Sequence, residues 1–489
     1  MFSAISNISL SLPHLGFPFK KSPSSSSSSS TNPHHQQAIK IPRVEVHDVE
    51  ITSDKRGRRL KHLLKLNHAT FSILYNRLRF HNHTPHILGS AYLLGGTADH
   101  LTAIYEDAAT NEGHEHWTES PSEIAEHDYR DYLGRREFQR AFVDFFEDEL
   151  VQHGYDWKDV VEKFLFERGN PQKTNNIEPI FNCLTAGLGH PLIHLGYAYE
   201  LNSREVAMEA LGLAATCYDR NLARLFESEP EPQPQKGGVP PQTVSDLFEL
   251  FTRVHNDTRL DSAFDHFGGD NLSHLLADPK LTSILLEHWH SWSIDDATRA
   301  FEQSQGLATA LLISTSPHPS IGGHGYDFFI VHLLTTSHAV RILVSFLDAK
   351  YHVPLVREWL LITLAIYIAQ LRPVINKKYV TEYDLQGRDW DNFVVPAAVQ
   401  GKHKFDAHFV KACRAMKEAE KVWGGGDSET GYGKDYWLKA AVRFTAEFDG
   451  WGGFGPADEV EVRELREQEQ EQQQEEERKR QSQSTGYSD

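Results

Sequence analysis

Cysteine, methionine and positive charge are all scarce in this chain of 489 residues. It has 3 Cys, 3 Met and 49 Lys and Arg against 68 Asp and Glu, which leaves a net charge of −19. Three cysteines cannot crosslink a chain of this length or build a Cys-based zinc or iron–sulfur site. Nucleic-acid and anionic-membrane binders carry basic patches that neutralise phosphate. We therefore expect neither a nucleic-acid nor a membrane partner.

Several sequence motifs of common enzyme classes are also missing. No G-x-G-x-x-G for NAD or FAD follows a strand, and there is no G-x-x-x-x-G-K-[ST] phosphate loop. Neither the H-E-x-x-H zinc motif nor the G-x-S-x-G nucleophile motif occurs. A redox enzyme with this sequence would hold its cofactor by means other than a standard nucleotide fold.

The two ends of the chain have low-complexity compositions. Residues 1 to about 42 contain no Asp or Glu and include a serine run, whereas residues 456–489 are rich in Glu and Gln. Neither segment can bury a core, so we expect disorder over 1–44 and 456–489 and one domain over 45–455. The Ser-rich start faintly resembles an organelle transit peptide but lacks an Arg-rich amphipathic helix. Otherwise we expect a cytoplasmic protein.

Helical periodicity dominates between these two ends. Apolar residues recur at helical spacing in 136–150, 156–169, 203–226 and 405–426. Segments 327–349 and 357–371 are apolar on most faces, but the first is interrupted by histidine and arginine. The second is shorter than the about 20 residues of a membrane span. We predict buried core helices for both. With one alternating stretch at 39–52 that predicts a strand, the fold class is all-α, a single large multi-helix domain with at most a minor strand pair.

Histidine is the residue in excess, with 28 copies, and it is the commonest metal ligand in proteins. Most copies lie in loops, tails and polar segments, where surface positions are the default. In FHNHTPHILGSAYLLGG, which contains His81, His83 and His86, the Thr84–Pro85 pair predicts a helix start. His86 then lies in the first turn of an apolar helix. Its side chain points inward if the apolar face of that helix points inward.

Two further histidine groups lie in apolar helical segments. His190 and His194 in GLGHPLIHLGYAYEL are spaced i, i+4, so they share a helix face and can converge on one ion. Two core histidines bonded to carbonyls or carboxylates are the alternative, and the sequence leaves both open. His332 lies in the middle of a run of large apolar residues, whereas His338 points elsewhere. His408 in FDAHFVKACR is interpreted as a packed or ligand-supporting residue.

An oxygen ligand often completes a histidine-rich metal site. Asp327 is the nearest carboxylate in sequence to the histidine groups. Lys377 or Lys378 in RPVINKKYV offers another route, because a neutral lysine amine can take up CO₂ and become a carbamate. Taken alone, these two lysines are C-terminal helix charges favoured by the helix dipole.

The histidine-containing segments, together with FDAHFVKACRAMKEAEKVWG, resemble the questin oxidase-like family of fungal polyketide metabolism. The resemblance runs from about residue 62 to 425, and the first motif departs from the family pattern at Ile87. The family is associated with oxidative opening of anthraquinone rings. Its members were first described as NADPH-dependent Baeyer–Villiger-type oxygenases. Some resemble non-haem iron dioxygenases, in which four histidines and a carboxylated lysine hold the iron.

Carried onto this sequence, the resemblance implies an Fe(II) site made of His86, His190, His194, His332 and Lys377, with Lys378 as the alternative to Lys377. Lys377 would then also be a catalytic residue, carboxylated by CO₂. The implied reaction is dioxygenase cleavage of a C–C bond of an aromatic polyketide by O₂. A planar, apolar substrate would need aromatic walls. Candidates for these walls are Phe328, Phe329, Trp289 and Trp292. Each of them could equally be an ordinary core residue.

Three other functions remain open at this point. The first is an NADPH-dependent Baeyer–Villiger-type oxygenase without tightly bound metal, which the missing nucleotide fingerprint disfavours. The second is a non-catalytic helical scaffold whose histidines are satisfied in the core. That hypothesis requires no metal and gains weight if His190 and His332 lie more than about 10 Å apart, given metal–nitrogen bonds of about 2 Å. A metal-dependent hydrolase is the third. The exact substrate and the oligomeric state stay open.

Overall fold

The two most apolar segments of the sequence form neighbouring helices in the interior of the protein. In the computed structural model, segment 327–349 forms α13 (Phe328–Leu343), and segment 357–371 lies mostly within α14 (His352–Ala369). The Asp327 carboxylate caps α13 by accepting hydrogen bonds from the N–H groups of Phe329 and Ile330. Within the part of the chain that the structure describes, residues 349–369 alone are long and apolar enough to cross a membrane. Of this apolar stretch, 89% is buried inside the protein. This burial identifies a core helix, as predicted.

The structure describes residues 38–110, 113–228, 243–321, 323–425, 432–456 and 458. These residues belong to one unit, which spans 34–489. The predicted disordered segments lie outside the described residues, except for 38–44, 456 and 458. Residues 38–44 lie against the core, where Ile39 and Val44 are buried and the Ile39 N–H donates to His352 Nδ1 (3.1 Å).

The described residues contain 18 α-helices and two pairs of two-residue strands. The helices not yet given are α1 (Lys55–Thr70), α2 (Thr84–Leu93), α3 (Ala98–Thr110), α4 (Gln139–Gln152), α5 (Trp157–Phe166), α6 (His190–Leu201), α7 (Arg204–Thr216), α8 (Arg220–Phe226), α9 (Leu247–His255), α10 (Asp270–Ala277), α11 (Pro279–Ser291), α12 (Ala297–Ser314), α15 (Lys378–Thr381), α16 (Val395–Gln400), α17 (Ala407–Trp423) and α18 (Tyr436–Glu447). The strands β1 (Leu74–Tyr75) and β2 (Phe80–His81) pair antiparallel, and β3 (Tyr326–Asp327) and β4 (Trp451–Gly452) pair parallel. The predicted all-α class is confirmed.

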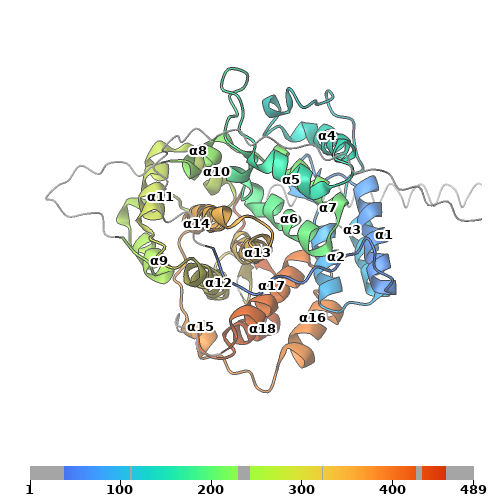
Figure 1. The fold of residues 1–489 in the computed structure, drawn as a ribbon. Coiled ribbons are helices and arrows are strands. Elements are labelled where there is room, and N and C mark those ends of the chain that lie inside the picture. Colours follow the sequence, from blue (N-terminus) through green and yellow to red (C-terminus); the bar gives the residue numbers. More distant parts are fainter. Residues whose placement is uncertain are drawn as a thin grey trace, which may run out of the picture. The chain divides into compact units, whose positions relative to one another are not determined.

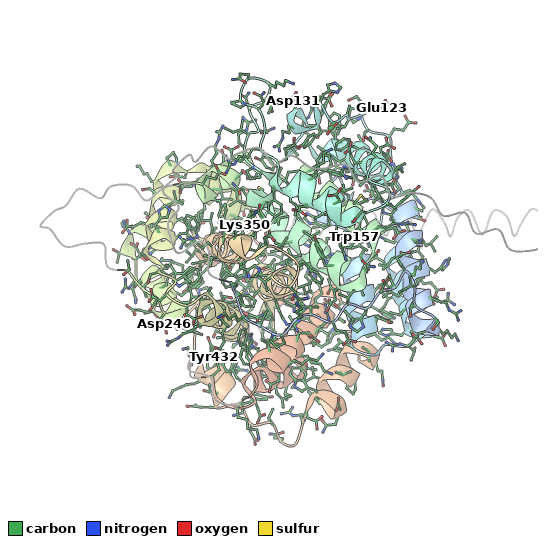
Figure 2. All side chains as sticks on the ribbon, viewed as in Figure 1. Glu123, Asp131, Trp157, Asp246, Lys350 and Tyr432 are labelled. Atoms are coloured by element: carbon green, nitrogen blue, oxygen red, sulfur yellow. The ribbon has the colours of Figure 1, made fainter. Side chains whose placement is uncertain are left out.

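Helix α13 packs against four others, α6, α12, α14 and α17 (Figure 1). Helix α2 packs against α6 and α17, and α7 packs against α6, α4 and α1. Figure 2 shows the side chains that fill the spaces between these helices. Helices α2, α6, α13 and α17, which come from distant parts of the sequence, therefore meet in one region, and each of them carries or adjoins histidines.

Two sequence predictions are wrong in detail. Residues 39–52 form no strand, because no neighbouring strand pairs with them. Instead, the N–H groups of His47 and Val49 donate to the carbonyls of Glu200 and Leu201 (2.8 and 3.1 Å), which the end of α6 leaves without helical partners. Segment 203–226 is two helices rather than one. Ser203 caps α7, but Asp219 caps a new helix, α8, with its carboxylate.

Candidate metal centre

Four histidine side chains converge at the place where four helices meet. His83 directly precedes α2, His190 is the first residue of α6, and His332 and His408 lie within α13 and α17. One ring nitrogen from each lies within 4.8 Å of the others. Nε2 of His83 and His190 are 2.7 Å apart, and Nε2 of His332 and His408 are 3.1 Å apart. Metal–nitrogen bonds of about 2.0–2.2 Å would place ligand nitrogens about 3–4.4 Å apart, so this group is close to the spacing that a metal requires.

Backbone carbonyls orient two of the four rings. His190 Nδ1 lies 2.6 Å from the Gly187 carbonyl, and His332 Nδ1 lies 2.8 Å from the Phe328 carbonyl. A carbonyl can only accept, so Nδ1 carries the proton in both rings and Nε2 keeps its lone pair. Metal-bound histidines are usually held in this way by a bond from the other ring nitrogen. The tautomers are thus the ones that a metal site needs.

The histidines of this group are neutral at physiological pH. Burial lowers the pKa of His332 to about 3, and it lowers the pKa values of His83, His190 and His408 well below the usual range. Lys411 on α17 is 2% exposed, and its positive charge contributes to the lowering in all four. Neutral imidazoles bind metal, whereas imidazolium ions do not. The region therefore combines four neutral nitrogen donors with one buried lysine.

A left-handed turn directs His190 toward α13. Gly187, Leu188 and Gly189 have φ values of +55°, +58° and +76°. A Cβ on Gly189 would lie 2.1 Å from the Thr336 Cγ2 atom on α13. Only glycine lets the backbone approach α13 this closely with that φ angle. The position of His190 therefore depends on the absence of a side chain at the preceding residue.

Replacing Gly189 with alanine is expected to lower the free energy of unfolding by at least about 2 kcal/mol, because strain and a clash with Thr336 add up. It should also weaken metal binding by displacing His190. Gly154 is a matched control, since its φ is +63° but nothing lies within 4 Å of the added Cβ. Gly154→Ala should cost only about 1 kcal/mol and leave metal binding unchanged. Denaturant unfolding and metal titration of both variants check this, and equal effects would contradict it.

The structure places the other predicted histidine ligands beside this group rather than among the converging atoms. His86 Nε2 lies 2.7 Å from His194 Nδ1, and His194 Nε2 lies 3.0 Å from a carboxylate oxygen of Glu209 on α7. The ring centroid of His86 is 6.0 Å from that of His190. The structure thus brings His190 and His332 together with His83 and His408, and it pairs His86 with His194 in an adjoining layer.

The two predicted lysines lie at the start of another helix, α15, away from the four histidines. Lys377 directly precedes α15, which packs against α12 and α18, and its Nζ atom lies 3.5 Å from the ring centroid of Phe248. Burial lowers the pKa of Lys377. Lys378 is exposed, and its Nζ atom lies 3.4 Å from a carboxylate oxygen of Glu382. The carboxylate of Asp327, the acidic ligand candidate, is engaged elsewhere. It caps α13, and it lies 3.1 Å from Nε2 of His318.

His83, His408 and Lys411 are not among the ligands predicted from the sequence. His408 and Lys411 are spaced i, i+3, so they share a face of α17. A histidine and a lysine on one face of a buried helix are the signal that could have identified them. His83 stands at the same spacing from His86, but spacing alone does not say which of the two rings faces α13.

Next to the histidines lies a buried ion cluster. His68 on α1 lies between two carboxylates: its Nδ1 is 3.0 Å from Glu209 and its Nε2 is 2.8 Å from Glu147 on α4. Burial alone would lower the pKa of His68, but hydrogen bonds to Glu147 and Glu209 raise it to about 10. Burial alone would raise the pKa of Glu209, but bonds from His194 and His68 lower it to about 2. At neutral pH, His68 is therefore an imidazolium between two carboxylates.

This charge should make stability depend on pH. Because the pKa of His68 rises on folding from 6.5 to about 10, its stabilisation is complete below pH 6.5 and is lost as pH rises toward 10. His68→Gln should cost about 3 kcal/mol at pH 6 and much less near pH 10, since removal of one partner of a buried pair costs about 3–5 kcal/mol. His62→Gln, an exposed site on the same helix, is the control. Denaturant unfolding between pH 6 and 10 measures the difference, which must shrink with pH.

Aromatic side chains surround one side of the four histidines. The Phe328 ring lies 5.1 Å from His332 and 4.6 Å from His408, and it also contacts Phe454 and Trp451. Of the four predicted wall residues, Phe328 therefore adjoins the group, and Phe329 packs against Phe454. The other two predicted wall residues, Trp289 on α11 and Trp292 just after it, both contact Arg357 of α14. The Trp289 indole N–H donates to the Arg357 backbone carbonyl (2.9 Å), and the Trp292 carbonyl accepts from the Arg357 guanidinium (3.2 Å).

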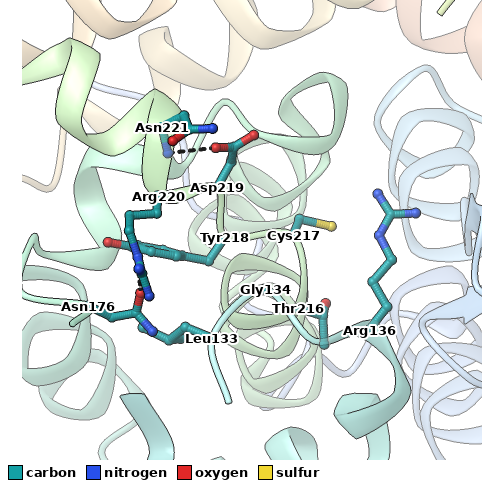
Figure 3. Close-up of a pocket in the computed structure, with 10 residues that line it drawn as sticks. All are labelled: Leu133, Gly134, Arg136, Asn176, Thr216, Cys217, Tyr218, Asp219, Arg220 and Asn221. Carbon is teal, nitrogen blue, oxygen red and sulfur yellow. Dashed lines mark hydrogen bonds between the residues drawn. The ribbon is translucent and has the colours of Figure 1, made fainter. Parts of the chain in front are cut away.

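A separate polar pocket of about 470 Å³ lies near the start of α8 (Figure 3). Arg220 donates to Asn176 on one side, and Arg136 and Cys217 line the other side. Cys217 Sγ lies 3.4 Å from His81 Nε2, and the His81 ring stacks on His190 with centroids 3.9 Å apart. Contacts through Cys217 and His81 thus connect the lining of this pocket to His190.

Four convergent, neutral imidazoles, two of them with a tautomer fixed by a backbone carbonyl, are typical of a metal-dependent enzyme, and comparison with known proteins supports an enzyme. A sequence model described as questin oxidase-like matches residues 80–416, and the chain belongs to this family. The match contains all four converging histidines and Lys411.

Relatives of known name agree with this family assignment. A Baeyer-Villiger oxidase of Pestalotiopsis microspora is 26% identical over 78% of this chain and 83% of its own length. A questin oxidase of Aspergillus fumigatus is 24% identical over 74% of this chain and 80% of its own length. A Baeyer-Villiger oxidase of Paecilomyces divaricatus is 26% identical over 74% of this chain and 78% of its own length. The chain is therefore an oxidoreductase.

Proposed function

We propose that the protein is a non-haem iron-dependent dioxygenase of fungal secondary metabolism that opens the central ring of an anthraquinone-type polyketide. The observation that carries this proposal is the convergence of His83, His190, His332 and His408 within 4.8 Å. The name of the A. fumigatus relative supports the substrate class. A scaffold function loses its support, because the ring centroids of His190 and His332 are 5.0 Å apart.

The proposed ligand set consists of these four histidines and Lys411. Donor chemistry supports it: the imidazoles are neutral, and in His190 and His332 the Nε2 lone pair is free of the proton. A bare lysine ammonium beside a metal ion would be repelled, whereas a carbamate formed from the amine and CO₂ would supply a negatively charged oxygen. Lys411 is the buried lysine whose charge acts on all four histidines, and we therefore assign it this role instead of Lys377 or Lys378.

Iron(II), when bound there, would supply the electrons that activate O₂ toward a ring carbon next to the quinone carbonyl. The protein would bind and orient the substrate. Phe328, Trp451 and Phe454 offer aromatic faces beside His332 and His408, and a planar polycyclic ring system stacks favourably on such faces. These partly buried rings would also shield the reacting carbon from water.

An NADPH-dependent Baeyer–Villiger-type reaction on the same substrate class is the second candidate. The names of two of the relatives favour it. It inserts one oxygen atom from O₂ next to a carbonyl of the quinone and consumes one NADPH. A dioxygenase places both atoms of O₂ in the product and consumes no NADPH, because the substrate in its reduced hydroquinone form supplies the two further electrons. The two candidates therefore differ in oxygen and electron balance.

Isotope labelling decides between them. The purified protein, loaded anaerobically with Fe(II), is supplied with ¹⁸O₂ and a hydroxyanthraquinone, either oxidised with NADPH or reduced beforehand to its hydroquinone, and the mass of the acid product is measured by mass spectrometry. A dioxygenase gives two labelled atoms, needs no NADPH and is inhibited by iron chelators. One labelled atom with stoichiometric NADPH consumption and chelator resistance would establish the Baeyer–Villiger reaction. Less than a tenth of an equivalent of iron after loading would refute the metal site.

A further inference from the structure

Outside the histidine group, a serine, a histidine and an aspartate are linked in this order by hydrogen bonds. Ser320 Oγ lies 2.9 Å from His318 Nδ1, and His318 Nε2 lies 3.1 Å from Asp327 Oδ2. His318 and Ser320 lie in the loop between α12 and β3, and Asp327 ends β3. This is the spatial order of the serine hydrolase triad, which recurs on unrelated folds and is recognised by geometry rather than by sequence position. The missing G-x-S-x-G motif therefore does not exclude it.

Burial differs among these three residues in the way that acyl transfer requires. His318 is 2% exposed and Asp327 is 1% exposed, whereas Ser320 is exposed. A nucleophile needs a base within hydrogen-bond distance, and the base needs a third group that orients it. The buried pair can hold one geometry while a substrate reaches the residue that carries the hydroxyl group.

The hydrogen bonds fix the tautomer of His318. The backbone N–H of Ser320 donates to His318 Nδ1 (3.2 Å), so Nδ1 carries the lone pair and Nε2 carries the proton. The Nε2–H group therefore donates to Asp327 Oδ2, while Asp327 Oδ1 accepts from the N–H groups of Phe329 and Ile330. The hydroxyl group of Ser320 in turn donates to Nδ1. The basic nitrogen thus faces the proton that it would take.

Two glycines bring the backbone close to this group. A Cβ on Gly452 would lie 2.7 Å from His318 Nδ1 and 2.9 Å from Ser320 Oγ. A Cβ on Gly453 would lie 2.7 Å from Asp327 Oδ2. The Gly453 N–H donates to Ser320 Oγ (3.1 Å). This N–H would stabilise the negative charge that develops on Oγ as the proton leaves.

Apolar side chains adjoin the serine and the histidine. Ile321 directly follows Ser320 and is 47% exposed, and the ring centroid of Phe267 lies 4.9 Å from that of His318. An uncharged aryl group suits such neighbours better than a charged group does. An aryl ester is also easier to cleave than an alkyl ester, because a phenol, with a pKa of about 10, is the better leaving group.

We propose that Ser320, His318 and Asp327 form a second catalytic site, which hydrolyses small aryl esters. Ser320 is the nucleophile and His318 is the general base and acid. Asp327 is a positioning residue, because it holds the ring and the tautomer of His318. The site is independent of the candidate metal centre and of the proposed function.

The atoms balance in each of the two steps. Ser320 Oγ attacks the ester carbonyl carbon as its proton passes to His318 Nδ1. The bond from this carbon to the aryl oxygen then breaks, and the aryl oxygen takes the proton, which gives a phenol and an acylated Ser320. Water next attacks the acyl carbon and gives a proton to Nδ1, and Ser320 Oγ regains that proton as the acid leaves. One ester and one water become one phenol and one carboxylic acid.

Covalent labelling of iron-free, full-length protein tests this site. Diisopropyl fluorophosphate should attach to Ser320, as mapped by mass spectrometry, and p-nitrophenyl acetate should be hydrolysed. Ser320→Ala should lose this adduct and lower the hydrolysis rate at least about 100-fold, in the range of acid–base groups. Ser122→Ala is the matched control, since Ser122 is also exposed but its hydroxyl group donates to a backbone carbonyl. An unlabelled Ser320, or equal hydrolysis in the two variants, would overturn the proposal.

A further variant tests the positioning role of Asp327. Asparagine also caps helices well, so Asp327→Asn should keep α13 folded while its amide nitrogen faces His318 Nε2. Because this nitrogen can only donate, the proton of the ring should move to Nδ1, which then cannot accept from Ser320. The ¹⁵N NMR signals of His318 report the tautomer, and labelling of Ser320 should slow at least about 100-fold. Labelling as fast as in the wild type would overturn the triad, whatever the tautomer.

Discussion

Alanine at any one of His83, His190, His332 and His408 is expected to remove bound iron and turnover together. Each ring supplies one of the four convergent nitrogens, so removal of any one leaves an incomplete ligand set of three. Loss of supporting residues around a metal site already costs about 10–100-fold in affinity or activity, so loss of a ligand should exceed 100-fold. Elemental analysis should find less than a tenth of an equivalent of iron, and kcat/KM should fall by more than 100-fold.

His86 and His194 are the controls for this experiment. Because both lie beside the converging nitrogens rather than among them, His86→Ala and His194→Ala should retain most of the iron. The family resemblance, by contrast, implies these two residues as ligands. Iron loss in His86→Ala and His194→Ala, together with full iron in His83→Ala and His408→Ala, would restore that prediction and contradict the ligand set proposed from the structure.

Lys411→Met is expected to have an effect of similar size. Methionine is apolar and close to lysine in volume, so the buried site on α17 should still fold. Without the carbamate, the iron site has only neutral donors and should bind iron at least about 100-fold more weakly, beyond the usual cost of losing a supporting group. Lys377→Met and Lys378→Met should leave iron content and kcat unchanged, because Lys378 begins α15 and Lys377 directly precedes that helix.

Chemical rescue gives the Lys411 prediction a second test. Lys411→Ala leaves space in which acetate or propionate can supply the missing carboxylate oxygen, and activity should return with added acid. Wild-type protein freed of CO₂ should lose activity and regain it with bicarbonate, and ¹³C-bicarbonate should give a carbamate signal by NMR. Full activity of Lys411→Met, or loss of activity in Lys377→Met instead, would refute the assignment.

The histidine segments show how far a sequence can define a site. Helical spacing and apolar neighbours identified the regions around His86, His190 and His332, and all three meet in the structure. Spacing could not identify His83, because it precedes α2 and its ring direction depends on the turn after β2. His408 lies 76 residues from His332 along the chain, and only packing of α17 against α13 brings the two Nε2 atoms together.

The fold was more accessible than the site for a simple physical reason. Apolar periodicity determines which face of a helix is buried, and it correctly predicted an all-α domain with α13 and α14 as core helices. The residue at which a helix ends, and the residues that it contacts, depend on single side chains. Asp219 ends the continuity of segment 203–226 because its carboxylate caps the N–H groups of Asn221 and Leu222. The role of Lys411 could not be predicted from the sequence for a similar reason, since the sequence of an amphipathic helix with several lysines does not show which of them is buried.

The order of the four histidines along the chain has a consequence for biosynthesis. His83 is near the beginning of the described chain and His408 near its end, so the centre is incomplete until α17 has left the ribosome. Domains fold as units during or after synthesis, and iron can bind tightly only once the last ligand has arrived. Any iron held by all four histidines would therefore be taken up only after α17 has been synthesised. By binding the native chain it would stabilise the newly made protein, so the cellular iron supply would affect how much of that protein stays folded.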